Sequence, residues 1–410
     1  MKLHFYKYFV VAFVTILINL NIYEVNAQKI YRDTVYLQNY GEVNLWDNTV
    51  ALLYSFTYSK TQPSFLPGKI IEVEEGDSVM IYSQSVSNDG YHTIHLHGLD
   101  VNTINDGDPM TSFPLAPYSI FTYKFLATHA GTFIYHCHVG DVMHVQMGMY
   151  GLLIVKPKGS VKTAWTGGPA YSKTYSWLTS ELDKFWHENT PYAMMNDFKI
   201  PVFKPDYFLI NGKSKQQLSD TATAIVATIQ DKVYLRLANI GFYKHQFIFP
   251  ASLNAEVIDS DGRPLPKSFM ADTLNITPGE RYGVMLKSSN ALLSFVKVNF
   301  IDMFTQQIKG SEQVPINIVQ NVGTNDKDNA KKMIALSPNP AKNKLRVSVN
   351  LNGVKNYSIK IKDLFGRQIM EVLGEGSDSK DIDVASLSAG IYIAEVSLDG
   401  YTVSEKFIKE

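Results

Sequence analysis

The chain has 410 residues, with 38 Lys and Arg against 39 Asp and Glu, so its formal net charge is -1 at pH 7. A balance this close to zero argues against a general binding surface for nucleic acid or for an anionic membrane. Aromatic residues make up 12% of the chain, glycine and proline interrupt it often, and helical periodicity is scarce. This pattern predicts an all-β protein, and the length leaves room for two or three domains.

The first 27 residues are predicted to be a signal peptide. Lys2 and Lys7 supply positive charge, an apolar run follows at 9–20, and small residues at 25–27 form a cleavage site. An uncleaved anchor is the alternative, but the run is short for a bilayer. No later segment is long and apolar enough to cross a membrane, so we expect an exported, soluble mature protein.

Residues 28–160 are predicted to form a first β-domain. Residues 66–82 read as two short strands joined by a Glu-Gly-Asp turn, and an apolar strand at 150–155 closes the domain. Between them lie seven of the ten histidines, from His92 to His144, and the only cysteine of the chain. Candidate chemistry is therefore concentrated in this domain.

The rest of the chain divides by composition. A connector is expected at 161–204, and its stretch Trp177–Trp186 is the one place where a short helix or an interface loop is plausible. A second β-domain is predicted at 205–320. Polar residues at 321–333 indicate a linker, and short strands with glycine turns at 334–410 indicate a small β-sandwich.

The lone cysteine stands between two histidines in His136-Cys137-His138. Exported proteins usually pair their cysteines, so an unpaired one calls for a chemical explanation. If residues 133–138 form a strand, its period of two points Cys137 to one face and both histidines to the other. Two metal sites could then lie back to back, connected through three consecutive residues.

A thiolate, two imidazoles and a weak thioether form the ligand set of a blue-copper electron-transfer site. The sequence supplies that set once, as His92, Cys137, His144 and Met149. Met147 is a fallback axial ligand, because on a strand it has the same parity as Met149.

Four further histidines form two same-face pairs on two strands, and that face could hold more copper ions. They are His95, His97, His136 and His138. Only neutral imidazole binds metal, so affinity should fall as pH drops. Zinc is the rival metal, but a structural zinc site does not need eight potential ligands on opposite strand faces. Without metal, the cysteine would be a small buried hydrophobe.

Two segments resemble the copper motifs of multicopper oxidases, the laccase-like cupredoxin proteins. They are HTIHLHGLDVNTINDGDP and GTFIYHCHVGDVMHVQMGMYGLLIV. The gap from Cys137 to His144 resembles two-domain members more than three-domain laccases. The resemblance implies cupredoxin-like Greek-key β-barrels or sandwiches, with type 1 copper ligands at His92, Cys137, His144 and Met149.

The same resemblance assigns roles to the other residues of these motifs. His95, His97, His136 and His138 match the histidines that one domain gives to a trinuclear type 2/type 3 copper cluster. Asp106 matches an acidic residue that assists proton delivery during oxygen reduction; an ordinary Asp-Gly turn is its alternative. We expect His129 to support the site without binding metal, and His187 to face solvent.

The second β-domain also resembles a laccase-type cupredoxin domain, through FLING, RLANIGF and ITPGERYGV. Copper-binding versions carry another HxxHxH motif here, but this chain keeps only His245, which we interpret as a hydrogen-bonding residue of the core or of the domain interface. The family builds its cluster from eight histidines, and this chain supplies four. Two copies of the first domain could face each other across a two-fold axis, another protein could supply the missing half, or the cluster could be absent.

Residues 334–410 resemble the type A C-terminal sorting domain of the type IX secretion system of Bacteroidetes, through LSPNPA, YSIKIKDLFGR and LSAGIYI. The implied role is delivery across the outer membrane, with removal on the way. The alternative is a small β-sandwich that serves binding or stability.

The sequence therefore predicts a secreted copper oxidoreductase. It would oxidise a small reducing substrate, a phenol or a metal ion, at a type 1 copper and reduce dioxygen at an interface cluster. A blue-copper carrier without oxygen chemistry is the first alternative. A nitrite-reductase-like enzyme is the second, although His95 and His138 stand where that family has other residues. A zinc-stabilised adhesin is the third. Expected partners are a second copy or another protein, and the type IX machinery.

Overall fold

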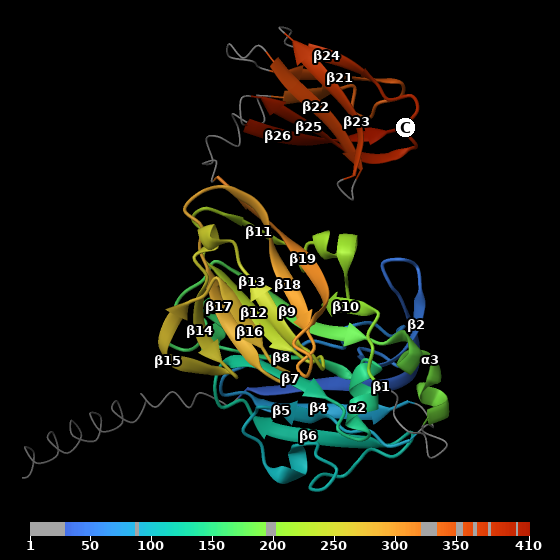
Figure 1. The fold of residues 1–410 in the computed structure, drawn as a ribbon, viewed down its shortest axis with the longest axis vertical. Coiled ribbons are helices and arrows are strands. Elements are labelled where there is room, and N and C mark those ends of the chain that lie inside the picture. Colours follow the sequence, from blue (N-terminus) through green and yellow to red (C-terminus); the bar gives the residue numbers. More distant parts are fainter. Residues whose placement is uncertain are drawn as a thin grey trace, which may run out of the picture. The chain divides into compact units, whose positions relative to one another are not determined.

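The computed structural model describes residues 29–86, 90–193, 202–320, 334–349, 356–363, 367–375, 379–398 and 401–410. The predicted signal peptide at 1–27 and the predicted linker at 321–333 lie outside these residues. The described chain is dominated by strands, which confirms the predicted all-β class (Figure 1). It divides into two compact units, Met1–Gln320 and Asn321–Glu410. None of the helices within the described ranges is long and apolar enough to cross a membrane.

Two four-stranded sheets form domain one, with strand orders β2-β1-β4-β6 and β3-β8-β7-β5. Its strands are β1 (Ile30–Asn44), β2 (Val50–Thr57), β3 (Ile71–Glu74), β4 (Ser78–Ser85), β5 (His95–His97), β6 (Ile120–Leu126), β7 (Gly131–His136) and β8 (Tyr150–Lys156). In β4 every second side chain is buried, as expected for a strand that turns one face to the core. Side chains such as Val35, Ile81 and Phe133 meet between the sheets in one core. The two strands expected within 66–82 are β3 and β4, which lie in different sheets.

Domain two contains a six-stranded sheet of order β10-β9-β12-β17-β14-β15 and a five-stranded sheet of order β11-β19-β18-β13-β16. Its strands are β9 (Lys173–Leu182), β10 (Tyr207–Ile210), β11 (Ile225–Thr228), β12 (Val233–Asn239), β13 (Lys244–Ile248), β14 (Glu256–Ser260), β15 (Arg263–Met270), β16 (Thr273–Ile276), β17 (Arg281–Leu286), β18 (Leu292–Ile301) and β19 (Ile308–Val319). Trp177, Phe247 and Val298 belong to the core between these sheets.

The segment expected to be a connector, 161–204, contains β9, and the structure corrects this expectation. β9 pairs with β10 and β12 inside the larger sheet of domain two. Its last six residues are all buried, so the strand lacks the alternation that would have revealed it. The stretch Trp177–Trp186, where a short helix or an interface loop was expected, is mostly strand, and helix α3 (Lys184–Ala193) begins only near its end. His187 on α3 is buried rather than exposed, and its Nδ1 lies 2.5 Å from the carbonyl oxygen of Leu52.

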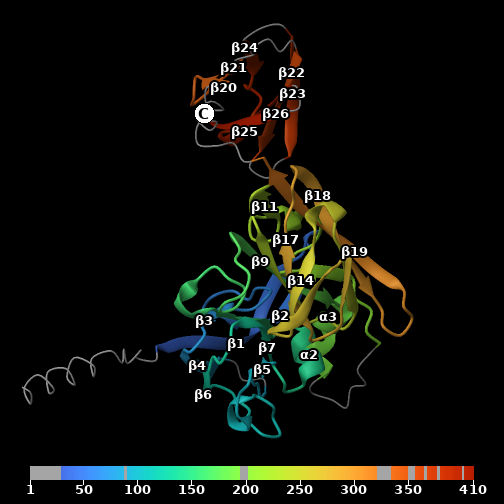
Figure 2. The same cartoon turned by 90° about the vertical axis from the view of Figure 1, so that its left-hand side faces the viewer.

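Short helices complete the first unit: α2 (Asp141–Gln146) and the 3-10 turns η2 (Thr103–Asn105), η3 (Lys158–Ser160), η4 (Lys215–Ser219) and η5 (Ala251–Leu253). Helix α2 lies next to α3 in both views (Figures 1 and 2). The two domains pack against each other through an apolar cluster that joins Ile134 and Val145 of domain one to Leu178 and Ile240 of domain two. The position of α2 therefore depends on both domains.

The second unit is a β-sandwich, as predicted, with sheet orders β20-β21-β24 and β23-β22-β25-β26. Its strands are β20 (Ile334–Ser337), β21 (Lys344–Val349), β22 (Asn356–Asp363), β23 (Gln368–Glu375), β24 (Ser379–Asp383), β25 (Gly390–Leu398) and β26 (Tyr401–Lys409). Val347, Ile359 and Ala394 are fully buried between the sheets.

Candidate metal centre

The strands β5 and β7 bring three histidines to one face of their sheet. They pair antiparallel, with His95 opposite His136 and His97 opposite Ile134. Residues that face each other across an antiparallel pair project to the same side. A strand over 133–138 was considered from the sequence. β7 in fact ends at His136, so Cys137 and His138 lie just beyond it.

The cysteine lies between two imidazoles in the interior of domain one. The Cys137 Sγ is 3.2 Å from Nδ1 of His144 and 3.8 Å from Nδ1 of His92, and all three residues are fully buried. Burial by itself raises the pKa of the Cys137 thiol. Hydrogen bonds with His144 and His92 and the charge of these two residues together outweigh this effect and lower the pKa to about 5. The thiolate is the form of cysteine that binds metals.

Three separate backbone elements supply these side chains. His92 lies in a loop that forms an isolated bridge with Leu115, and His144 lies on α2. Met149 is buried immediately before β8, and its carbonyl oxygen accepts a hydrogen bond of 3.0 Å from the Cys137 backbone N–H. Met147 is also buried, but it caps the C-terminus of α2, so the strand parity argued for it does not apply.

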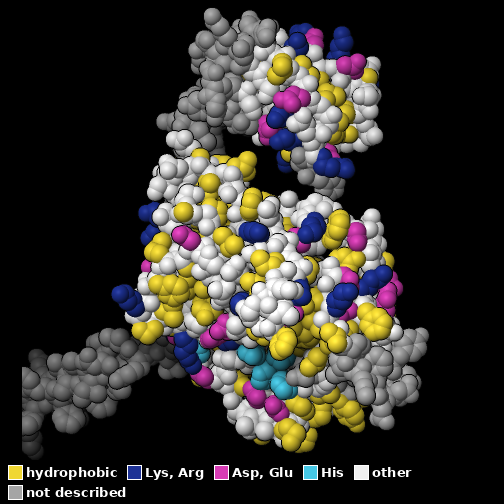
Figure 3. Space-filling model, viewed as in Figure 1, with side chains coloured by type: hydrophobic (Ala, Val, Ile, Leu, Met, Phe, Trp, Pro, Cys, Tyr) yellow, Lys and Arg dark blue, Asp and Glu magenta, His cyan; other side chains and the backbone are white. Residues whose placement is uncertain are grey.

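A second group of imidazoles lies on the other side of the Cys137 backbone. The ligand atoms of His95, His97 and His136 lie within 4.8 Å of one another. Nε2 of His136 is 3.4 Å from Nδ1 of His97, and the His138 ring centroid lies 4.9 Å from that of His95. Histidine side chains reach the surface together in the space-filling view, with acidic side chains beside them (Figure 3).

The surroundings of His97 and His136 favour neutral imidazole. Burial lowers the pKa of His97 to about 4, and the positive charges of Arg281 and His95 add to the effect. Burial likewise lowers the pKa of His136 to about 3, although a hydrogen bond to the Cys137 carbonyl oxygen opposes the shift. Neutral imidazole is the form that binds metal, so these side chains need lose no proton to do so near neutral pH.

Asp106 lies beside the histidine group. Its carbonyl oxygen is 2.8 Å from Nδ1 of His95, and its carboxylate is 3.6 Å from the same nitrogen. The side chain is about one-third exposed, so it connects the group to solvent. His129 lies apart from both groups; its ring packs edge-on against Phe133 at 5.4 Å between centroids.

Domain two places no histidine in this group among its described residues. His245 is fully buried in the core of that domain, 2.5 Å from Oε1 of Glu181 and 2.6 Å from Oγ1 of Thr179, which confirms its interpretation as a hydrogen-bonding residue. The turn before β17 instead approaches the histidine group. A Cβ on Gly279 would lie 3.2 Å from Nε2 of His97.

Sequence reasoning missed a buried cation next to this turn. The side chain of Arg281 is only 5% exposed; its Nη1 lies 3.0 Å from Asp261 and donates to the Gly279 carbonyl oxygen at 2.7 Å. Its other terminal nitrogen packs against Gly98, which follows His97. The motif ITPGERYGV contains both residues, but its spacing alone did not indicate that they reach the histidines.

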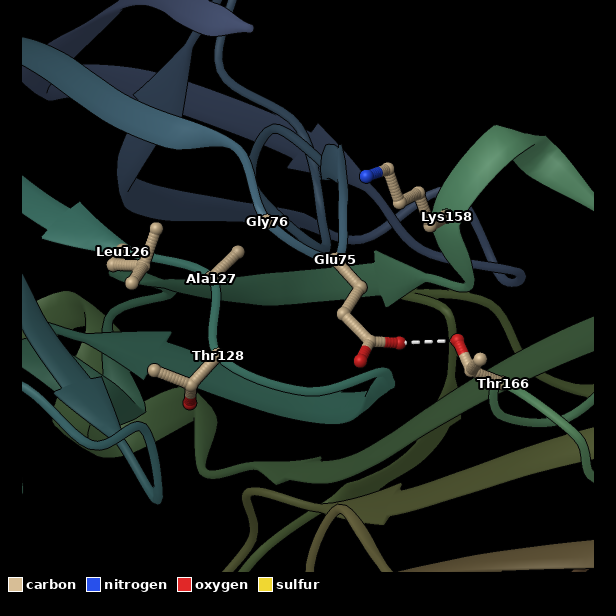
Figure 4. Close-up of a pocket in the computed structure, with 7 residues that line it drawn as sticks. All are labelled: Glu75, Gly76, Leu126, Ala127, Thr128, Lys158 and Thr166. Carbon is tan, nitrogen blue, oxygen red and sulfur yellow. Dashed lines mark hydrogen bonds between the residues drawn. The ribbon is translucent and has the colours of Figure 1, made fainter. Parts of the chain in front are cut away.

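A separate hollow of about 310 Å³ lies elsewhere on domain one, near the turn after β3 (Figure 4). Its lining consists of Glu75, Gly76, Leu126, Ala127, Thr128, Lys158 and Thr166. The Thr166 hydroxyl donates to the Glu75 carboxylate. With no imidazole or thiol in its lining, this hollow is no candidate for the copper chemistry.

His92, Cys137 and His144 are called the thiol-imidazole group below, and their donor atoms fit copper. Two Nδ1 atoms converge on one sulfur whose pKa is lowered, and buried methionine sulfur is available in the same core. Soft sulfur with imidazole is the combination that copper electron-transfer sites use. Nε2 of His144 is buried without a hydrogen-bond partner, so no second acceptor competes for the orientation of that ring.

Comparison with known proteins gives consistent matches along the chain. Multicopper oxidase family models match residues 61–160 and 178–312, and a model of the secretion system C-terminal sorting domain matches 335–410. Laccase-9 of Arabidopsis thaliana is 26% identical over 236 residues, which cover 55% of this chain and 37% of that protein. The copper-containing nitrite reductase of Neisseria gonorrhoeae is 39% identical over 173 residues, covering 42% of this chain and 41% of that protein.

Solved structures show the same cupredoxin-like architecture. The blue copper oxidase of Nitrosomonas europaea has a TM-score of 0.57 and 28% identity, covering 71% of this chain and 86% of that one. The copper nitrite reductase of the same organism has a TM-score of 0.55 but only 19% identity, covering 72% and 95% of the two chains, and shows the fold alone. The matches to Laccase-9 and to the Neisseria nitrite reductase span well under half the length of those two proteins.

Proposed function

The chain belongs to the multicopper oxidase family, and on that premise we propose that it is a copper oxidase that couples one-electron oxidation of a small reducing substrate to reduction of dioxygen. Its cofactor is copper. One observation carries the proposal. Cys137 belongs to the buried thiol-imidazole group, while its neighbours in the sequence, His136 and His138, belong to the histidine group.

In this proposal the ligands of a type 1 copper are His92, Cys137, His144 and Met149. Copper bound there supplies one-electron redox chemistry, with a potential that depends on the axial ligand and on the surroundings of the sulfur. The protein excludes water from the sulfur, holds it as a thiolate, and links it covalently to His136 and His138. Those two residues, with His95 and His97, are proposed to hold the copper ions at which dioxygen is reduced.

We propose that a second copy of the chain completes this histidine group. The part of domain two that approaches His97 carries Gly279 and Arg281, and neither residue offers a side-chain ligand for copper. His95 and His138 remain partly exposed. Large apolar side chains on the loop that contacts His95 are open to solvent, with Met110 at 90% and Phe113 at 71% exposure, as an interface would require.

Copper stoichiometry tests the proposal together with assembly mass and oxygen uptake. We expect a blue protein that forms an oligomer, binds more than two copper ions per chain on average, and consumes dioxygen with a phenolic donor. One copper per chain without oxygen uptake would contradict the oxidase and leave a blue-copper carrier. A colourless zinc protein after copper loading would contradict both.

Nitrite reduction is a second candidate, because the Neisseria relative with 39% identity is named for that activity. The compact group of His95, His97 and His136 also has the donor number of a single three-histidine copper site. Anaerobic assays with a reduced donor separate the two activities. Nitric oxide formation from nitrite, without oxygen uptake in air, would favour this candidate over the oxidase.

The sorting domain supports a location outside the cell or at its surface. We propose that residues 1–27 direct export and that residues 334–410 are recognised by type IX secretion machinery and removed. A chain that ends at residue 333 should then remain in the periplasm with its copper sites intact. Its secretion at the normal level would contradict the proposed route.

A further inference from the structure

The connection between domain two and the copper ligand His144 is not explained by the proposed chemistry. His144 lies on α2, a helix of six residues. A helix this short is marginal by itself, so tertiary contacts must determine its position. Its N-cap is Gly140, with a left-handed φ of 55° and no side-chain hydrogen bond, so the helix has no cap of the usual kind.

Gln146, the last residue of α2, supplies such contacts on the side that faces domain two. Its side-chain Nε2 donates to the carbonyl oxygen of Glu181 at 3.0 Å, and its Oε1 accepts from the backbone N–H of Asp183 at 2.7 Å. Gln146 is only 5% exposed, so these bonds form away from water. The neighbouring Val145 packs against apolar residues of domain two in the same interface.

The segment that Gln146 contacts is itself firmly held. Glu181 is fully buried at its carboxylate, where it meets His245 and accepts the backbone N–H of Phe242 at 2.8 Å. The carboxylate of Asp183 accepts the backbone N–H groups of Trp186 and Lys204, at 3.2 Å and 2.7 Å. The end of β9 is thus a fixed support for α2.

We infer that Gln146 is a positioning residue for the thiol-imidazole group: it ties α2 to β9 and so holds His144 at Cys137. This inference rests on the proposed copper site. It also gives domain two a role in a site to which it contributes no ligand among its described residues. Groups that orient metal ligands typically contribute 10–100-fold to affinity or activity, by order of magnitude.

The test replaces Gln146 by methionine, which keeps the length of the side chain and removes both hydrogen bonds. The matched control is Gln38→Met on β1. Gln38 is 6% exposed and donates to two backbone carbonyl oxygens, of Ser59 and Lys60, far from α2 in the sequence. Both variants lose two hydrogen bonds of a buried glutamine side chain, so both should lose thermal stability.

Only Gln146→Met should alter the copper site. We expect its copper affinity at the blue site to fall by about 10-fold or more, with a weaker blue band per bound copper and a shifted reduction potential. Gln38→Met should keep the wild-type values. Wild-type affinity, spectrum and potential in Gln146→Met would overturn the inference, as would equal changes in both variants.

Two measurements without copper keep the inference separate from the proposed function. Cys137 in copper-free Gln146→Met should react with a thiol reagent several-fold faster than in Gln38→Met, because α2 covers the thiol less tightly. Equal rates would contradict the positioning role even if the wild-type protein never turns blue. If Gln146→Met does not fold, hydrogen exchange in the wild-type chain still decides: α2 amides should be as protected as those of β9, and rapid exchange confined to α2 would contradict the inference.

Discussion

The two cupredoxin-like domains of this chain use buried histidine in opposite ways. In domain one, Nε2 of His136 lies 3.4 Å from Nδ1 of His97 on the neighbouring strand, and no carboxylate of the described residues forms an ion pair with either imidazole. In domain two, both ring nitrogens of His245 are taken, one by the Glu181 carboxylate and the other by the Thr179 hydroxyl. A metal needs a free imidazole lone pair, so the partners of a histidine, more than its burial, separate a ligand from a structural residue.

The change with the largest expected effect removes the centre of domain one. Cys137→Ser should abolish the blue absorption and the oxidase activity, because the hydroxyl is not a soft ligand and is not ionised at neutral pH. The histidine group should still bind copper, which metal analysis would detect. A blue band that survives in this variant would place the chromophore elsewhere.

The contrast between the two domains predicts different stability costs for histidine removal in copper-free protein. His245→Ala removes the imidazole that contacts the buried Glu181 carboxylate and should lower the free energy of unfolding by about 3–5 kcal/mol. His97→Ala removes an imidazole that forms no ion pair within the described residues and should change the free energy of unfolding by about 1 kcal/mol or less. Denaturant unfolding measures both. Equal costs would contradict the distinction between ligand and structural histidines.

The free energy of unfolding should depend on pH through His187, which lies on α3 and contacts Leu52 of domain one. Burial lowers the pKa of His187 to about 4, below about 6.5 in an unfolded chain. Its contribution is therefore fully present above pH 6.5 and is lost as pH falls toward 4, by at most about 3 kcal/mol. Unfolding of His187→Gln should be less pH-dependent over this window than that of the wild type. Parallel pH profiles would show that His187 does not titrate in this way.

Asp106 should have the smallest effect of the four. Asp106→Asn removes a carboxylate 3.6 Å from Nδ1 of His95 but keeps the backbone contact. We expect oxidase turnover to fall by about 10-fold with copper content unchanged. Asp108→Asn, two residues away, is the control, because its carboxylate accepts the Met110 backbone N–H instead. Equal rates in both variants would reduce Asp106 to a turn residue.

Sequence patterns were sufficient where side chains repeat with a clear period or at a characteristic spacing. The HxH and HCH motifs correctly indicated that His95, His97 and His136 share one face, because β5 and β7 are simple antiparallel partners. Strand β9 escaped notice because it is buried on both faces and its sequence does not alternate. The extent of β7 was overestimated by two residues, since nothing in the sequence marks where the pairing with β8 ends.

The contacts between domains were beyond reach of the sequence for a different reason. Arg281 approaches His97, and Gln146 contacts Glu181, across more than thirty residues of chain in each case. Such pairings depend on how the two domains pack, which no local period encodes. The expectation that His187 faces solvent failed in the same way, because its partner Leu52 lies on a distant strand.

Anomalous X-ray diffraction at the copper edge, from crystals of the copper-loaded chain, tests the central claim most directly. The account predicts one copper among His92, Cys137, His144 and Met149, and further copper at the group of His95, His97, His136 and His138. It also predicts that a second copy of domain one faces that group. Copper at the thiol group alone, with the histidine group empty and facing solvent, would contradict the account.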